Sequence, residues 1–453
     1  MIPHGSLLPL GGRPKRFQTH PTKGEGKNDL APFWQSADFL HRIHEAKTLK
    51  GWCVLPRSAR IPQNVPMNQQ NPQVTTLGVT TGRYRPRPFG ILQPDRLMHM
   101  YIIGQTGVGK TTFMHNMMLQ DIAAGRGFCF IDPHGDLAEE MAIAGNIDHY
   151  WNPADPCCTL GYNPLNFVTP EFRPLLASGL IDTLKKQWAD AWGVRMEHLL
   201  RFTLLALLER PRSSLDDIVP MFLEKGFRAE VLRKVADEQV LSFWQKEYPA
   251  MNYKTASDGF APIANKIGAF LAHPLVRKVV CDPEQPLRFR KIMDDGQSLV
   301  INLAKGRLGA DISNVLGGLI ISSIANAAYT RQSLTERDRR PFFLYVDEFH
   351  SFTTGAFADM LSELRKYGLG MVLAGQYSAQ GEAEILEAIL GNVGTLICFR
   401  LGVGDAPLFA KHLATPSILP RDLINLPNYE MVVRLMVEGK QSVGFSTSGK
   451  LEA

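Results

Sequence analysis

Apolar residues recur along the chain in short continuous runs and in helical stripes, and the two patterns alternate. The short runs are typical of buried strands, which we expect at 101–103, 128–131, 299–303, 343–346, 371–374 and 395–399. The stripes predict helices from about 110 to 125 and at 311–330, 355–367 and 382–390. Because strand, helix and strand follow one another, the pattern predicts an α/β fold with a mostly parallel sheet.

Residues 166–290 interrupt this alternation with helical periodicity alone. Short β-like pieces near 76–92 precede the first buried run, and residues 431–446 are typical of a closing β-hairpin. We therefore expect four parts: a basic flexible N-terminal arm and linker at 1–75, the first part of the core at 76–165, an all-helical insertion domain at 166–290, and the second part of the core at 291–453.

The N-terminal part differs from the rest in charge. The first hundred residues carry 14 basic and 5 acidic side chains and the remainder carries 35 and 39, so a net charge of +9 precedes one of −4. Residues 31–50 have the spacing of a short amphipathic helix, and the Pro, Gln and Asn residues of 56–75 are typical of a linker. Such a basic segment favours contact with nucleic acid or an anionic membrane surface, and the alternative is a solvated arm.

The overall composition is that of a globular protein, with 45% hydrophobic and 21% charged residues, which excludes a disordered, collagen-like or disulfide-framework chain. Six scattered cysteines without a CxxC pair are typical of a reducing cytoplasm. The best candidate span, Val315 to Ala328, is shorter than the ~20 apolar residues that a helical span needs. We expect no direct membrane span, and a protein that is cytoplasmic or attached to the inner membrane through a partner.

A glycine-rich turn with a phosphate-binding pattern follows the first buried run. The sequence GQTGVGKT at 104–111 fits GxxxxGK[ST], the Walker A motif, between a strand and a helix, where a chance match is improbable. Glycines let backbone N–H groups surround phosphate oxygens, Lys110 would reach the β- and γ-phosphates, and Thr111 would offer its hydroxyl to Mg²⁺. The candidate nucleotide-binding residues are Gly104, Gln105, Thr106, Gly107, Val108, Gly109, Lys110, Thr111 and Thr112.

Two adjacent acids end the run FFLYV and resemble a Walker B motif. We expect them on a strand neighbouring the glycine-rich turn, with Asp347 orienting Mg²⁺ and Glu348 polarising the attacking water. A solvated strand end is the alternative, but the pairing with the turn favours hydrolysis of a nucleotide. The 236 residues between Thr111 and Asp347 leave room for the helical insertion.

From about residue 76 onward the chain resembles the FtsK/HerA superfamily of P-loop motor ATPases, and most closely the TraG/TraD-like coupling proteins of type IV secretion and conjugation. The resembling segments include PFGILQPDRLMHMYIIGQTGVGKTT, FCFIDPHGDL, INLAKGRLG, LYVDEFHSF, LRKYGLGMVLAGQY and GNVGTLICFRLGVGDA. The resemblance implies a RecA-like P-loop NTPase core that assembles into a hexameric ring, with ATP and Mg²⁺ between subunits. Membrane-anchored coupling proteins carry transmembrane helices before this core, and here an arm and linker stand in their place.

The resemblance also assigns roles to three further residues. Arg365, in LRKYGL, matches the arginine finger that one subunit offers to the next, and Gln376 matches a polar sensor of the γ-phosphate. The alternative for Arg365 is a cation near a helix C-terminus. Arg400 is a second finger candidate, whose alternative is a strand-end cation paired with Asp405. In DPHGD, Asp132 and His134 either line the site or form a turn.

A ring that threads DNA needs cationic groups that grip phosphates. The candidates are Arg83, Arg85, Arg87, Lys305 and Arg307. The first three alternate and would share one face of an extended strand, although a charge-guarded edge strand has the same pattern. Without a zinc ribbon or an aromatic RNA-binding motif, any DNA contact should be independent of sequence.

The sequence is compatible with two functions. In the first, the chain is an ATP-hydrolysing ring motor that translocates DNA. In the second, it is a coupling or assembly ATPase that recruits and remodels protein substrates of a secretion machine without moving DNA. Under either function the partners would be further copies of the chain and secretion-channel, relaxase or nuclease proteins.

Overall fold

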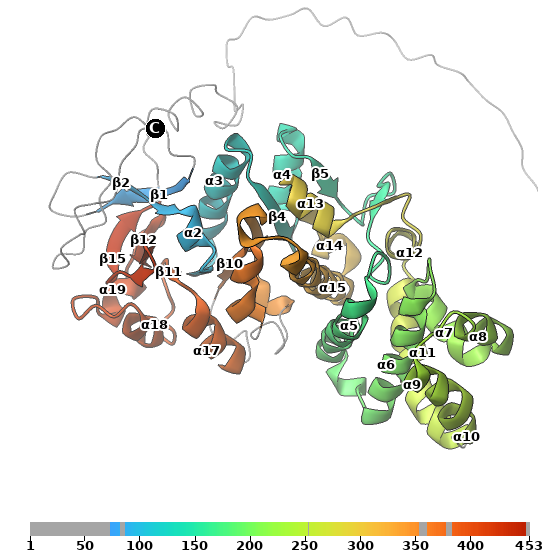
Figure 1. Cartoon of the computed structure of the whole chain (residues 1–453). Coiled ribbons are helices and arrows are strands. Elements are labelled where there is room, and N and C mark those ends of the chain that lie inside the picture. The colour runs from blue at the N-terminus through green and yellow to red at the C-terminus, as the bar shows by residue number, and fades with distance from the viewer. Residues whose placement is uncertain (1–72, 82–86, 252, 353–359, 377–382, 450–453) are drawn as a thin grey trace, which may run out of the picture.

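The computed structural model describes residues 73–81, 87–251, 253–352, 360–376 and 383–449. Within them, the largest sheet has eleven strands in the order β2-β1-β15-β12-β11-β3-β10-β9-β4-β8-β5 (Figure 1). Seven neighbours run parallel: β3 (Met100–Ile103), β4 (Gly127–Asp132), β5 (His149–Trp151), β8 (Ser298–Asn302), β9 (Phe342–Val346), β10 (Leu369–Gly375) and β11 (Thr395–Cys398). The predicted α/β class with a mostly parallel sheet is confirmed.

Antiparallel strands extend this sheet on one side. β12 (Glu430–Arg434) pairs with β11 and with β15 (Phe445–Ser448), and a short ribbon of β13 (Met436–Val437) and β14 (Lys440–Gln441) lies between them. The predicted C-terminal hairpin is therefore confirmed. β1 (Val74–Thr80) pairs with β15 and with β2 (Pro88–Leu92), so the first described strands lie beside the last.

Both faces of the parallel strands are covered by helices, which explains why the strands are apolar throughout. On β3, Ile102 belongs to a cluster with α3 (Lys110–Ala123) and α4 (Asp136–Ala144), whereas Tyr101 and Ile103 face the other layer. That other layer includes α15 (Ala310–Tyr329), α17 (Ala383–Asn392) and α18 (Ala406–His412).

The remaining core helices are short. They are α2 (Gln93–Arg96), α13 (Phe289–Asp295), α14 (Lys305–Leu308) and α19 (Pro420–Ile424). Of the helix expected at 355–367, residues 355–359 lie outside the described residues. Its described end is a short helical stretch followed by the 3₁₀ turn η9 (Leu364–Tyr367).

Between residues 173 and 281 the regular secondary structure is helical, and these helices extend away from the sheet (Figure 1). They are α5 (Arg173–Gln187), α6 (Val194–Glu209), α7 (Ile218–Leu223), α8 (Lys225–Leu232), α9 (Glu238–Ser242), α10 (Tyr248–Ala250), α11 (Tyr253–Leu271) and α12 (Pro274–Cys281). The ends of this helical part lie together, because β6 (Leu160–Gly161) pairs with β7 (Gln285–Pro286). The expected all-helical segment at 166–290 is wrong at its end, because residues 285–286 form a short strand, β7. The domain boundaries themselves stay a prediction, and the arm, linker and helix expected before residue 73 lie outside the described residues.

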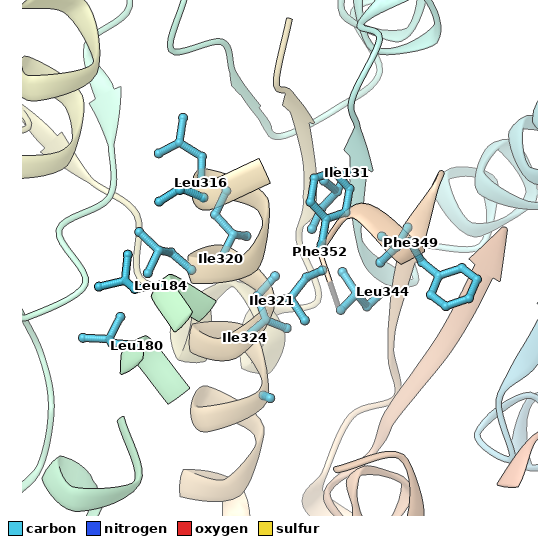
Figure 2. Packing of buried hydrophobic residues seen from close by; sticks show 14 of the residues in the cluster. Ile131, Leu180, Leu184, Leu316, Ile320, Ile321, Ile324, Leu344, Phe349 and Phe352 are labelled. Carbon is cyan, nitrogen blue, oxygen red and sulfur yellow. The ribbon is translucent and has the colours of Figure 1, made fainter. Parts of the chain in front are cut away.

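α15 packs between the helical part and the sheet. Leu180 and Leu184 of α5 lie on one side of it, and Ile131 and Leu344 of the sheet lie on the other (Figure 2). By length and composition, residues 310–333 are the one helical stretch of the described chain that could cross a membrane, and 72% of its apolar window is buried inside the protein. The apolar surface of α15 is thus used for packing between α5 and the sheet.

Candidate active site

The glycine-rich turn closes over the carboxyl end of β3. Gly107 and Gly109 have φ angles of +76° and +111°, which side chains other than hydrogen rarely allow. The Lys110 ammonium folds back on the turn and donates to the carbonyl oxygens of Gly104 (2.7 Å) and Gln105 (3.0 Å). The loop, its lysine and the N-terminus of α3 therefore lie together at the carboxyl end of β3, an arrangement that suits the binding of phosphate.

The two acids end β9 at the same edge of the sheet. Asp347 Oδ2 accepts a hydrogen bond from Thr111 Oγ1 over 3.5 Å, and its Oδ1 accepts one from the Glu348 backbone N–H (2.9 Å). Burial, together with the nearby charges of Glu348 and Asp132, raises the pKa of Asp347 to about 6. Burial also lowers the pKa of Lys110, against the opposing charges of the two acids. A cation between these groups and a phosphate would relieve the repulsion between the carboxylates.

Gln376, at the end of β10, connects the turn to the second acid. Its Nε2 donates to Glu348 Oε1 (2.5 Å), and its Oε1 accepts from Thr106 Oγ1 (3.0 Å). The other carboxylate oxygen of Glu348, Oε2, is buried and accepts no hydrogen bond, although His350 Nδ1 lies 3.5 Å away. Of the two carboxylate oxygens of Glu348, Oε2 is thus the one that no donor occupies.

The strand order corrects one expectation. Asp347 and Glu348 were expected on a strand neighbouring the glycine-rich turn, but β10 lies between β3 and β9. The backbones of β3 and β9 therefore lie about two strand spacings, roughly 10 Å, apart. Gln376, at the end of the strand between them, connects Thr106 of the turn to Glu348.

The two arginine candidates lie at opposite ends of the parallel strands, Arg400 at the carboxyl ends and Arg365 at the amino ends. Arg400 follows β11 beside the turn of its own chain, where its guanidinium donates to Gln105 Oε1 (3.2 Å) and to the Leu426 carbonyl (3.3 Å). Arg365 lies in η9, before β10, with its Nη1 2.8 Å from Met98 Sδ. Because β10 is seven residues long, roughly 20 Å separates Arg365 from the turn. Arg365 therefore does not reach the glycine-rich turn of its own chain.

The candidate DNA contacts are not brought together within one chain. Arg83 and Arg85 lie outside the described residues, and Arg87 is exposed at the start of β2, one edge strand of the sheet. Lys305 and Arg307 lie in α14, after β8 near the opposite edge. Arg307 is also 3.8 Å from Glu139 in an exposed ion pair.

Asp132 lies beside the site, but both of its carboxylate oxygens accept hydrogen bonds from the turn that follows β4. Its Oδ1 accepts from the His134 backbone N–H (2.9 Å), and its Oδ2 accepts from that of Ala138 (3.0 Å) in the first turn of α4. Among the two interpretations of the DPHGD segment, the contacts of Asp132 favour the turn.

Sequence reasoning missed an aromatic residue that touches the glycine-rich turn. The Tyr429 ring packs against Gly109 so closely that a Cβ at Gly109 would lie 2.7 Å from a ring carbon. The Tyr429 backbone N–H also donates to the Val108 carbonyl (2.8 Å). Tyr429 lies more than 300 residues from the turn along the chain, and no local pattern marks a contact of that kind.

The residues present fit a nucleoside triphosphate with Mg²⁺. The turn offers backbone N–H groups and a lysine to phosphates, and Thr111 and Asp347 offer the oxygen atoms that Mg²⁺ prefers. Within the described residues, there is no group of three or more His, Cys, Asp or Glu side chains that could hold a metal ion by themselves. That pattern suits a metal whose remaining ligands come from phosphates and water.

Residues 92–253 match the family model of the type IV secretion-system coupling protein DNA-binding domain. Among solved structures, the plasmid coupling protein TrwB in complex with a non-hydrolysable ATP analogue has a TM-score of 0.59 and 19% identity, over 85% of this chain and 90% of that one. TrwB with ADP and Mg²⁺ has a TM-score of 0.60 and 18% identity over the same shares. VirB4 of Thermoanaerobacter pseudethanolicus has a TM-score of 0.59 and 14% identity, over 83% of this chain and 96% of that one.

No curated protein sequence matches the chain. The solved relatives share the fold, and the family model adds a match that includes the glycine-rich turn and most of the helical part. The resemblance to type IV secretion-system coupling proteins is therefore confirmed, over residues 92–253 by the family model and over most of the chain by the fold.

Proposed function

We propose that the chain is a subunit of an ATP-hydrolysing ring motor that translocates DNA, as a coupling ATPase of a type IV secretion or conjugation system. The observation that carries the proposal is the carboxyl edge of the sheet, where Lys110 and Thr111 of the turn face Asp347 and Glu348 across Gln376. The similarity to coupling proteins supports both parts of the proposal, the binding of a nucleotide and the binding of DNA.

Each residue has a role that follows from its position. Lys110 and the turn would hold the β- and γ-phosphates, and Thr111 and Asp347 would hold Mg²⁺, which neutralises phosphate charge when it is bound. Glu348 would take a proton from the attacking water through Oε2, while Gln376 holds its Oε1 and would act as the sensor of the γ-phosphate. Arg400 would act on the nucleotide of its own chain.

We expect DNA to stimulate ATP hydrolysis severalfold at low salt. Binding that depends on phosphate contacts weakens steeply with ionic strength, so the stimulation should fall between about 50 mM and about 200 mM salt. The measurement is the ATPase rate with and without single- and double-stranded DNA of several sequences. Hydrolysis that is insensitive to DNA and to salt would contradict translocation and favour an ATPase that remodels secreted proteins.

Arg365 is expected to act on the nucleotide of a neighbouring subunit. Arg365 lies far from the turn of its own chain. This distance supports a ring in which the amino ends of the parallel strands of one subunit face the carboxyl ends of those strands in the next subunit. We predict that Arg365→Ala subunits mixed with wild type lower the ATPase rate more steeply than their fraction of the mixture. Lys366→Ala, the exposed neighbouring residue, is the matched control.

A fall in rate that is only proportional to the fraction of Arg365→Ala subunits would contradict this arrangement. It would favour instead the simpler interpretation of Arg365 as a cation that stabilises the end of its own helix.

A further inference from the structure

The helical part of the chain holds the turn that follows Glu348. At the C-terminal end of α5, Lys186 Nζ donates to the His350 carbonyl (2.8 Å) and Gln187 Nε2 donates to the Ser351 carbonyl (3.1 Å). Both side chains are half-buried. Buried carbonyl groups need donors, and here two consecutive carbonyls of the sheet's catalytic edge receive them from a helix 164 residues earlier in the chain.

The turn itself is a strained piece of backbone. Glu348 has a φ angle of +46°, in the left-handed region that costs a residue with a side chain roughly 1 kcal/mol or more. The 3₁₀ turn η8 (Phe349–Ser351) follows it, with the Ser351 N–H donating to the Glu348 carbonyl (3.0 Å). Such a conformation persists only where surrounding contacts fix it, and the donors from α5 are among those contacts.

α5 and the turn both pack against α15. The Phe352 ring lies against Gly317 of α15, where any added Cβ would overlap it, and Figure 2 shows this ring between α15 and the sheet. Gly179 of α5 lies against Ser322 of α15, and Gly179, Ser322 and Phe352 line one small pocket between α5, α15 and the turn. Because Lys186 and Gln187 donate directly to the turn, a movement of α5 must move the turn or break these hydrogen bonds.

We propose that Lys186 and Gln187 are positioning residues for Glu348, through which the helical part of the chain controls hydrolysis. The proposal rests on the proposed function, in which Glu348 activates water. α5 fixes the turn, the turn fixes the backbone of Glu348, and Gln376 fixes one of its carboxylate oxygens. Force applied to the helical part by a bound substrate is thereby converted into a change in the position of the catalytic carboxylate.

The test replaces both donors with methionine, which keeps the length of the side chains. The variant Lys186→Met/Gln187→Met is compared with Lys185→Met, a matched control on the same turn of α5, whose exposed side chain pairs with Glu197 instead (3.3 Å). The expected result is a fall in kcat on the order of tenfold or more, because small displacements of a reacting group are costly. KM for ATP should stay unchanged, and the loss of two hydrogen bonds should lower the unfolding midpoint only slightly. Lys186→Arg alone, which keeps a donor, should retain most of kcat.

A second measurement does not depend on activity. Hydrogen exchange of the backbone amides at 348–352 should become faster in the double variant and not in Lys185→Met. An unchanged kcat in the double variant overturns the proposal, as does a fall in kcat no larger than the fraction of protein unfolded under the assay conditions accounts for, which indicates a purely structural anchor. If the wild-type protein fails to hydrolyse ATP while exchange still accelerates, the proposed function is overturned and the connection between α5 and the turn stands.

Discussion

Replacing Glu348 with glutamine is expected to leave ATP bound and to lower kcat by about two to three orders of magnitude, the usual contribution of a general base. The amide has the shape of the carboxylate, so its oxygen can still accept from Gln376 Nε2, and the phosphate contacts of the glycine-rich turn are untouched. What is lost is the basic oxygen Oε2, which is buried, has no hydrogen-bond donor, and in the proposed function takes the proton of the attacking water.

The measurement is single-turnover hydrolysis together with the affinity for a non-hydrolysable ATP analogue. Glu363→Gln provides a matched control, since Glu363 is an exposed acid that pairs only loosely with Lys366 (4.0 Å). Lys110→Ala provides the contrast, because removal of the lysine should abolish binding and hydrolysis together. Turnover of Glu348→Gln at the wild-type rate would remove the catalytic assignment.

Most of the parallel sheet could be predicted from the sequence because its signals are local. Each of its longer strands is a short apolar run buried on both faces, and the glycine-rich turn needs only eight consecutive residues to define its chemistry. Asp347 and Glu348 were identified for the same reason, since they directly follow the run at 342–346.

The order of the strands could not be predicted in the same way, because pairing is decided by contacts between distant segments. Nothing near residues 369–375 indicates that β10 lies between β3 and β9. The same holds for the pairing of β1 with β15, and for Tyr429 against Gly109. The donors Lys186 and Gln187 look like solvated polar residues at a helix end, and their partners are backbone carbonyls, which leave no trace in a sequence.

The buried ion pair between Arg96 and Asp121 illustrates how contacts between distant segments determine stability. Arg96 of α2 donates to both carboxylate oxygens of Asp121 (2.8 and 2.9 Å), and Asp121 lies on α3, the helix that begins with Lys110. The Tyr345 hydroxyl of β9 donates to the same carboxylate (2.5 Å), and the guanidinium of Arg96 lies 3.6 Å from the centre of the Phe343 ring. This cluster fixes α3 relative to the strand that ends in Asp347.

We expect Asp121→Asn to destabilise the protein by about 3–5 kcal/mol at pH 7, because it leaves the fully buried Arg96 without a counter-charge. Asp258→Asn is the matched control, since its pair with Arg195 is exposed (3.5 Å) and should contribute about 0–1 kcal/mol.

Burial alone would raise the pKa of Asp121, but the charge and hydrogen bonds of Arg96 hold it below its ordinary value of 3.8. A carboxyl whose pKa is lowered by folding contributes its stability above that ordinary value and loses it as the pH falls through the folded pKa. Urea unfolding midpoints should therefore differ most between wild type and Asp121→Asn above about pH 5 and converge in stronger acid. Equal midpoints at pH 7, or a difference that grows as the pH falls, would contradict the role of this pair.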